Sequence, residues 1–91
     1  MKLGAEVADL SEPMRLALKA GTNGIIARLT AALRAGAADG SLAPVDAPAE
    51  VAASLYHLWL GASVMVKILR SQEPFDGAMR ATRQILGIAA L

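Results

Sequence analysis

Residues 51–66 form a run of sixteen positions without Asp, Glu, Lys or Arg in the middle of a 91-residue chain. The run holds the only Tyr, His and Trp of the sequence, Tyr56, His57 and Trp59, and the next charge comes at Lys67. A surface helix normally keeps one charged face, so a helix built from this run needs apolar cover on nearly every side. A chain of this length buries only about two-thirds or less of its unfolded surface. The run therefore predicts a central helix that one chain cannot cover by itself.

The composition indicates that oligomerisation buries the remaining apolar surface of this helix. The chain has no Cys, so it has no disulfide to stabilise a small core and no thiolate for a zinc site, an iron–sulfur cluster or thiol catalysis. Hydrophobic residues make up 55% of the chain and aromatic residues 3%, and the excess consists of Ala and Leu, which favour helices. We therefore expect an all-α fold that forms a homodimer.

The charge pattern argues against nucleic-acid binding by these residues. Nine basic and eight acidic residues are interspersed, which gives a net charge of +1 and no basic stripe. Glu6 and Asp9 interrupt what would have to be the apolar run of a secretory signal. A transmembrane helix needs about 18 to 20 apolar residues, more than the uncharged run provides. These features predict a cytoplasmic chain without a membrane span.

Helix start and stop signals divide the chain into about four helices. Ser11 before Glu-Pro is typical of an N-cap, and Gly40 suits the left-handed position after a helix. Asp46 before an Ala-Pro pair is interpreted as the N-cap of the central helix, and Gly87 as the end of the last one. The predicted helices cover residues 3–10, 12–38, 47–70 and 74–87.

Motifs for catalysis or metal binding are absent from the sequence. The residues three and four positions from His57 are Leu, Gly, Ala and Ser, so no metal-ligand pair forms around it within a helix. The carboxylates spaced three apart lie on polar faces, where they are solvated surface charges. Small all-α chorismate mutases are dimeric bundles of similar length, but their site gathers several Arg and Lys side chains inside the bundle. Here the basic residues map to polar faces, so we expect no enzyme, no cofactor and no metal.

The aromatic and methionine side chains allow two interpretations. Tyr56 and Trp59, with Met14, Met65 and Met79, could line a pocket for a small apolar or aromatic molecule, because aromatic and thioether groups bind flat hydrophobic ligands. The same residues could instead pack as an ordinary core, which is the interpretation that their residue types alone favour. Both interpretations stay open at this point.

The sequence resembles the C-terminal half of a TetR-family transcriptional regulator. The resemblance covers residues 3–86, and its most specific part is the segment LWLGAS at residues 58–63. Lys67, Arg70 and a turn at Pro74 follow this segment, and the last helix ends in RQIL. No single motif is diagnostic, and the order and lengths of the helices carry the resemblance.

The resemblance implies an effector-binding and dimerisation role in a repressor. In that family the last two long helices pack against their two-fold copies as a four-helix bundle, and the ligand pocket lies among the helices before them. The helix-turn-helix domain of the family is absent from this sequence, so DNA binding is expected to belong to an N-terminal domain outside it. Related repressors that sense electrophiles use a reactive Cys, and this sequence has none.

Two sets of residues are predicted to carry these roles. The dimer interface is expected to be a single patch presented by both subunits, on the central and last helices. Its predicted residues are Leu58, Gly61, Ala62, Met65, Ile68, Met79, Thr82 and Leu86. The predicted ligand-binding residues join the apolar stripe of the second helix to the aromatic pair, and they are Met14, Leu18, Ile25, Tyr56, Trp59 and Ser63.

A second function remains open at this stage, namely a stand-alone small helical protein whose homodimer is itself the functional unit. A stand-alone fold would cover the apolar positions Leu3, Val7 and Leu10. The repressor interpretation instead predicts an apolar surface at these positions.

Overall fold

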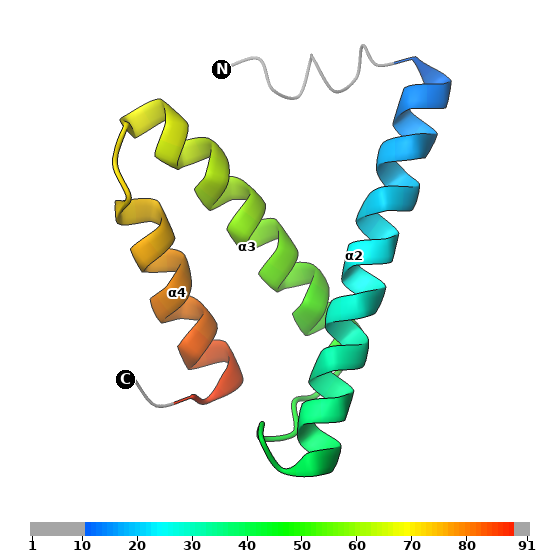
Figure 1. The fold of residues 1–91 in the computed structure, drawn as a ribbon, viewed down its shortest axis with the longest axis vertical. Helices are drawn as coiled ribbons and strands as arrows, with labels where there is room; N and C mark the ends of the chain where they lie inside the picture. The colour runs from blue at the N-terminus through cyan, green and yellow to red at the C-terminus, as the bar shows by residue number, and fades with distance from the viewer. Residues whose placement is uncertain (1–10, 89–91) are drawn as a thin grey trace.

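The computed structural model describes residues 11–88, which form three α-helices and no strand (Figure 1). Helix α2 spans Glu12–Asp39, α3 spans Pro48–Leu69 and α4 spans Glu73–Leu86. The all-α fold is confirmed, and each of these helices begins and ends within one residue of its predicted range. The helix predicted over residues 3–10 lies outside the described residues.

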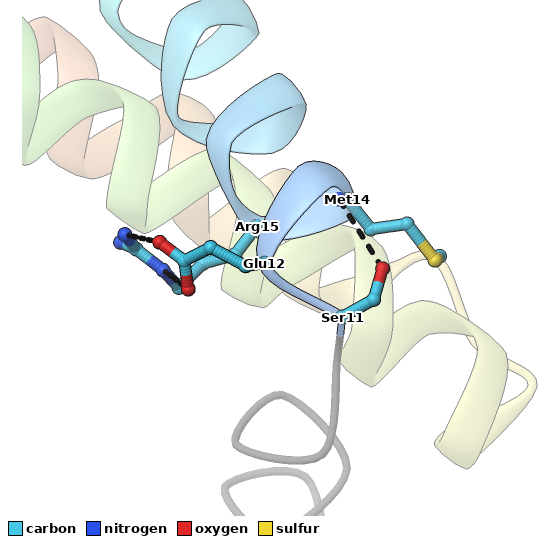
Figure 2. A network of polar contacts seen from close by, with 4 residues as sticks. All are labelled: Ser11, Glu12, Met14 and Arg15. Carbon is cyan, nitrogen blue, oxygen red and sulfur yellow. Dashed lines mark hydrogen bonds and ion pairs between the residues drawn. The ribbon is translucent and has the colours of Figure 1, made fainter.

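Helix α2 begins and ends where its local signals predict. The backbone N–H of Met14 donates to the Ser11 hydroxyl at 3.4 Å, as expected of an N-cap, and Arg15 Nε donates to the Glu12 carboxylate at 3.1 Å (Figure 2). This hydrogen bond lowers the pKa of Glu12. Gly40 ends the helix with φ 82°, a left-handed conformation that glycine adopts without steric cost.

The prediction that Asp46 caps α3 is wrong. The cap is Ala47, whose carbonyl accepts from the N–H groups of Glu50 at 2.9 Å and Val51 at 3.1 Å, and no side chain takes part. Ala47 has φ 48°, in the left-handed region that a residue other than glycine seldom adopts. The Asp46 side chain therefore makes no capping hydrogen bond with α3.

Helix α4 follows α3 after a tight turn. The Glu73 N–H at its start donates to the Ser71 hydroxyl at 3.1 Å. The predicted end at Gly87 is confirmed, since Gly87 has φ 67° and its N–H donates to the carbonyls of the last turn. α3 and α4 therefore form a hairpin and lie side by side (Figure 1).

The three helices form a single layer. The molecule measures 44 × 31 × 15 Å, and its shortest dimension is little more than the diameter of one helix with its side chains, about 10–12 Å. The radius of gyration is 15.3 Å, against about 12 Å for a compact domain of this length. α2 and α3 diverge from the loop that joins them, so the N-terminal half of α2 stands apart from the other helices (Figure 1).

A single layer gives a thin core. Its buried hydrophobic residues are mostly small, and Ala52 is fully buried while no large side chain among the described residues is. Thr30 is the buried polar residue, and its hydroxyl donates to the carbonyl of Ile26 at 2.7 Å. Many large apolar side chains remain exposed on all three helices, among them Met14, Leu16, Leu18, Leu60, Met65, Ile68, Leu69, Met79 and Ile85.

Helix α3 remains largely uncovered within one chain. By length and composition alone it could cross a membrane, with a mean hydropathy of 1.4 over its most apolar stretch, and only 17% of that stretch is buried. A mostly buried core helix of a soluble protein meets the same criteria of length and composition. In the single chain, most of the apolar surface of α3 is therefore exposed, as its sequence predicts.

Two glycines of α2 provide a matched test of its packing. A methyl group at Gly24 meets open space among the described residues, whereas one at Gly36 would lie 2.6 Å from Cδ1 and 2.8 Å from Cγ of Leu42. Gly24→Ala should therefore raise the free energy of unfolding by about 0.5–1 kcal/mol through helix propensity. Gly36→Ala should lower it by about 1 kcal/mol, because Leu42 must move. Urea unfolding followed by circular dichroism at one fixed protein concentration measures both, and equal stabilisation by the two changes would contradict the close contact.

Candidate functional site

An apolar cavity of about 400 Å³ lies where the three helices approach one another. Leu29, Ala32 and Leu33 come from the C-terminal half of α2, and Leu42 comes from the loop after it. Leu55, Tyr56 and Trp59 come from α3, and Thr82 and Leu86 from α4. No charged side chain is among these nine residues. The hydroxyls of Tyr56 and Thr82 and the indole N–H of Trp59 are their polar groups.

Trp59 joins α3 to α4 at the wall of the cavity. Its Nε1 donates to Thr82 Oγ1 at 2.9 Å, and its ring stacks on Phe75 with the centroids 5.9 Å apart and the planes 27° from parallel. Phe75 lies in the first turn of α4 and Thr82 two turns further on. These two contacts fix both the indole ring and the position of α4 against α3.

The polar groups beside Trp59 are already paired within the protein. The Thr82 hydroxyl accepts from Trp59 and donates to the carbonyl of Ala78 at 2.7 Å. The Ser63 hydroxyl donates to the carbonyl of Trp59 at 2.9 Å. No described residue forms a hydrogen bond with the Tyr56 hydroxyl, and the surface that the cavity exposes is almost entirely apolar.

The structure brings two of the six predicted ligand-binding residues to the cavity. Tyr56 and Trp59 both line it. Met14 and Leu18 are 55% and 57% exposed and lie on the part of α2 that stands apart from α3 and α4 (Figure 1). The proposed role of these four residues in ligand binding stays a prediction.

The other two predicted ligand residues are half-buried and lie outside the lining. Ile25 is one turn before Leu29 on α2, and Ser63 is bound to the Trp59 carbonyl one turn along α3. The sequence prediction missed the α2 residues that do line the cavity, such as Leu29 and Leu33. Leu29 and Leu33 continue the apolar stripe of α2 after Ile25, at intervals of four residues. The stripe therefore contained the lining residues, and its C-terminal half is the part that faces the cavity.

The predicted interface residues fall into three groups in the single chain. Gly61, Met65, Ile68 and Met79 are exposed, and Leu58 is half-buried. Ala62 is only 8% exposed, which shows that its own chain already covers it. Thr82 and Leu86 line the cavity. The interface stays a prediction. Through Thr82 and Leu86, α4 contributes both to the predicted interface and to the cavity wall.

The described residues contain no group of three or more His, Asp or Glu side chains that could hold a metal ion. The chemistry available at the cavity is therefore that of apolar contact and of single hydrogen bonds.

Comparison with known proteins identifies the family. Residues 1–82 match the family described as "Tetracyclin repressor-like, C-terminal domain". The chain belongs to this TetR family. The resemblance seen in the sequence is thereby confirmed, and the helical fold agrees with it.

The relatives are transcriptional regulators about twice as long as this chain. The HTH-type transcriptional repressor NemR of Escherichia coli K12 is 43% identical over 91 residues, which are all of this chain and 46% of that protein. The crystal structure of the reduced form of E. coli NemR has a TM-score of 0.84 at 46% identity, over 93% of this chain and 45% of that one. A putative regulator of the TetR/AcrR family has a TM-score of 0.81 at 36% identity, over 92% and 46% of the two chains. The chain thus spans about half the length of these TetR-family relatives.

The hydrogen bond between Trp59 and Thr82 can be tested with a double-mutant cycle. Thr82→Val keeps the shape of the side chain but leaves the indole N–H without its acceptor, so the free energy of unfolding should fall by about 1 kcal/mol. In a Trp59→Phe background, which has no N–H, the same change should have a smaller effect, because it then removes only the bond from Thr82 to the Ala78 carbonyl. Urea unfolding followed by circular dichroism measures the four proteins. An equal effect of Thr82→Val in both backgrounds would show that the two side chains are not coupled.

Proposed function

We propose that this chain is the effector-binding and dimerisation part of a ligand-responsive TetR-like transcriptional repressor, and that the cavity holds the effector. The observation that carries the proposal is the apolar cavity itself, which is walled by residues of α2, α3 and α4 in a chain of this family. Its volume falls in the range of small-molecule sites, about 300–1,000 Å³. Membership of a family of regulators supports the assignment of that molecule as an effector.

We propose that the uncovered apolar residues of α3 and α4 form the homodimer interface. Met65, Ile68 and Met79 are 38%, 50% and 42% exposed, and they belong to helices that one layer cannot bury. Packing α3 and α4 against their two-fold copies as a four-helix bundle removes this surface from water. An obligate interface of this kind buries on the order of 2,000 Å² in total.

The same interface accounts for the hydropathy of α3 without a membrane. A helix that contacts its own chain on one side and a second copy on another needs no charged face, so α3 can be apolar without crossing a membrane. We therefore propose a cytoplasmic protein without a membrane span. DNA contact is assigned to a helix-turn-helix domain and not to these residues, whose charges are balanced. The proposal also assigns no catalytic role, because the relatives are regulators and the cavity holds no reactive group.

Helix α4 provides a physical link between the cavity and the proposed interface. Thr82 and Leu86 line the cavity, while Met79 on the same helix is exposed. An effector that displaces Trp59 would act on Thr82 through their hydrogen bond and so on the position of α4. Effector binding and the geometry of the dimer would then be coupled through one short helix.

The dimer can be tested by placing a charge in the proposed interface. The wild-type chain should be a dimer at micromolar concentration, and Met65→Glu should shift it to a monomer because a buried unpaired carboxylate is strongly unfavourable. Asn23→Glu, at an exposed position on the polar side of α2, is the control and should leave the dimer intact. Multi-angle light scattering gives the mass of each. A folded wild-type monomer, or a Met65→Glu dimer as stable as wild type, would refute this interface.

The cavity can be tested by filling it. Leu29 is a half-buried lining residue, and Leu29→Trp adds an indole to the space that an effector would occupy, while Arg28→Trp adds the same group at an exposed neighbouring position. With 1-naphthol as the probe, wild type and Arg28→Trp should bind with similar affinity. Leu29→Trp should bind at least tenfold more weakly, and isothermal titration calorimetry measures the three affinities. Unchanged binding by Leu29→Trp would place the probe elsewhere.

A further inference from the structure

We infer that the two copies of α4 in the homodimer run antiparallel, with the acidic first half of each helix against the basic second half of the other. The residues that carry this pairing are Glu73, Asp76, Arg80 and Arg83. The inference rests on the proposed homodimer, and it adds the surface charges that decide how the two copies align.

The four charged residues of α4 share one face of the helix. They follow one another at intervals of three, four and three residues, which is the spacing of neighbours on a helix surface, and they are Glu73, Asp76, Arg80 and Arg83. Ala78 lies on the opposite face, which packs against α3, and it is only 2% exposed. Because α4 lies at one edge of the layer (Figure 1), its charged face points away from its own chain.

These charges find no counter-charge within residues 11–88. The ion pair of that part of the chain joins Glu12 to Arg15, far from α4. Arg80 and Arg83 instead border a hollow of about 410 Å³, together with Gln84, Gly87 and Ile88. The hollow has two guanidinium groups and no carboxylate among its lining residues. It therefore suits an acidic side chain that another chain supplies.

The order of the charges is self-complementary about a two-fold axis. In an antiparallel pair of identical helices, residues at equal distances on either side of the axis come level with each other. Glu73 and Arg83 lie five residues before and after Ala78. Asp76 and Arg80 lie two residues before and after it. One axis at the level of Ala78 therefore places every acidic residue opposite a basic one, whereas a parallel pair would align like charges.

Met79 connects the charged face to the apolar surface that the proposed homodimer buries. It is 42% exposed, and it is a neighbour of Asp76 and Arg83 on the helix surface, three and four residues away. Interfaces commonly have an apolar centre and a polar rim, and Met79 and these charges fit those two parts. Rim ion pairs add little affinity, but like charges brought together are strongly unfavourable. The charges of α4 therefore select the alignment of the two copies.

The same order of charges also acts inside a single helix. Acidic residues near the N-terminal end and basic residues near the C-terminal end complement the helix dipole. This effect stabilises each chain separately and does not depend on the charges of a second copy. Only an experiment that combines two different chains separates the two effects.

Pairing between chains is tested by mixing two charge-reversed variants. Arg80→Glu with Arg83→Glu makes the face entirely acidic, and Glu73→Arg with Asp76→Arg makes it entirely basic. Each variant alone should dimerise at least tenfold more weakly than wild type, because like charges then face one another. An equimolar mixture should dimerise within about threefold of wild type, because every pair is again of opposite charge. Light scattering over a concentration series measures the dissociation constants, and native mass spectrometry identifies the heterodimer by its mass.

The matched control reverses two charges elsewhere. Arg28→Glu with Arg34→Glu, at exposed positions of α2, should dimerise as wild type does. Circular dichroism checks the helix content of each variant. If a double variant loses helix, the single changes Asp76→Arg and Arg80→Glu repeat the mixing test at two exposed positions. A mixture without preference for the heterodimer, or variants that dimerise alone as tightly as wild type, would overturn the inference.

The outcomes separate failure of this inference from failure of the proposed homodimer. If Met65→Glu produces a monomer while the charge reversals have no effect, the proposed interface stands and only the pairing of charges on α4 fails. If the wild-type chain is a folded monomer, both fail.

Discussion

The apolar circumference of α3 is the constraint on which the rest of the structure depends. The helix packs against α2 and α4, and small residues such as Ala52 and Ala62 are buried where the backbones approach closely. A layer 15 Å thick cannot cover the remaining sides, so Met65, Ile68 and Leu69 stay exposed. This surface calls for a second layer of helices from outside residues 11–88, and the proposed two-fold copy of the α3–α4 hairpin would supply one.

Trp59 shows how so thin a molecule holds one helix pair in place. Its bond to Thr82 is the one hydrogen bond between side chains of different helices among residues 11–88, and its ring also stacks on Phe75. Contacts at two points along α4 restrain its position better than one contact would. The boundary between α2 and α3 has no such polar contact, and it is there, against Leu29, Leu33 and Leu55, that the cavity opens.

The sequence predicted the helices well because their ends depend on neighbouring residues. Ser11, Gly40 and Gly87 act within their own turns, and all three predictions are confirmed. The Asp46 prediction failed because the chain enters α3 through the left-handed conformation of Ala47, which is the N-cap in place of Asp46. The cavity was predicted less well, because the angle between α2 and α3 decides which part of the α2 stripe faces it. That angle depends on packing and not on periodicity, so Tyr56 and Trp59 were found while Leu29 and Leu33 were missed.

The position of Thr82 and Leu86 changes how the two proposed roles relate. The sequence placed both residues in a dimer interface separate from the ligand wall, whereas the structure places both in the cavity lining. In the proposed function the cavity and the interface therefore share α4, a helix of fourteen residues that packs mainly against α3. If an effector binds one position of α4 more tightly than another, it must change the dimer by the same free energy. Because this linkage is reciprocal, the proposed function requires that the affinity of the effector in turn depend on whether α4 is held by a second copy.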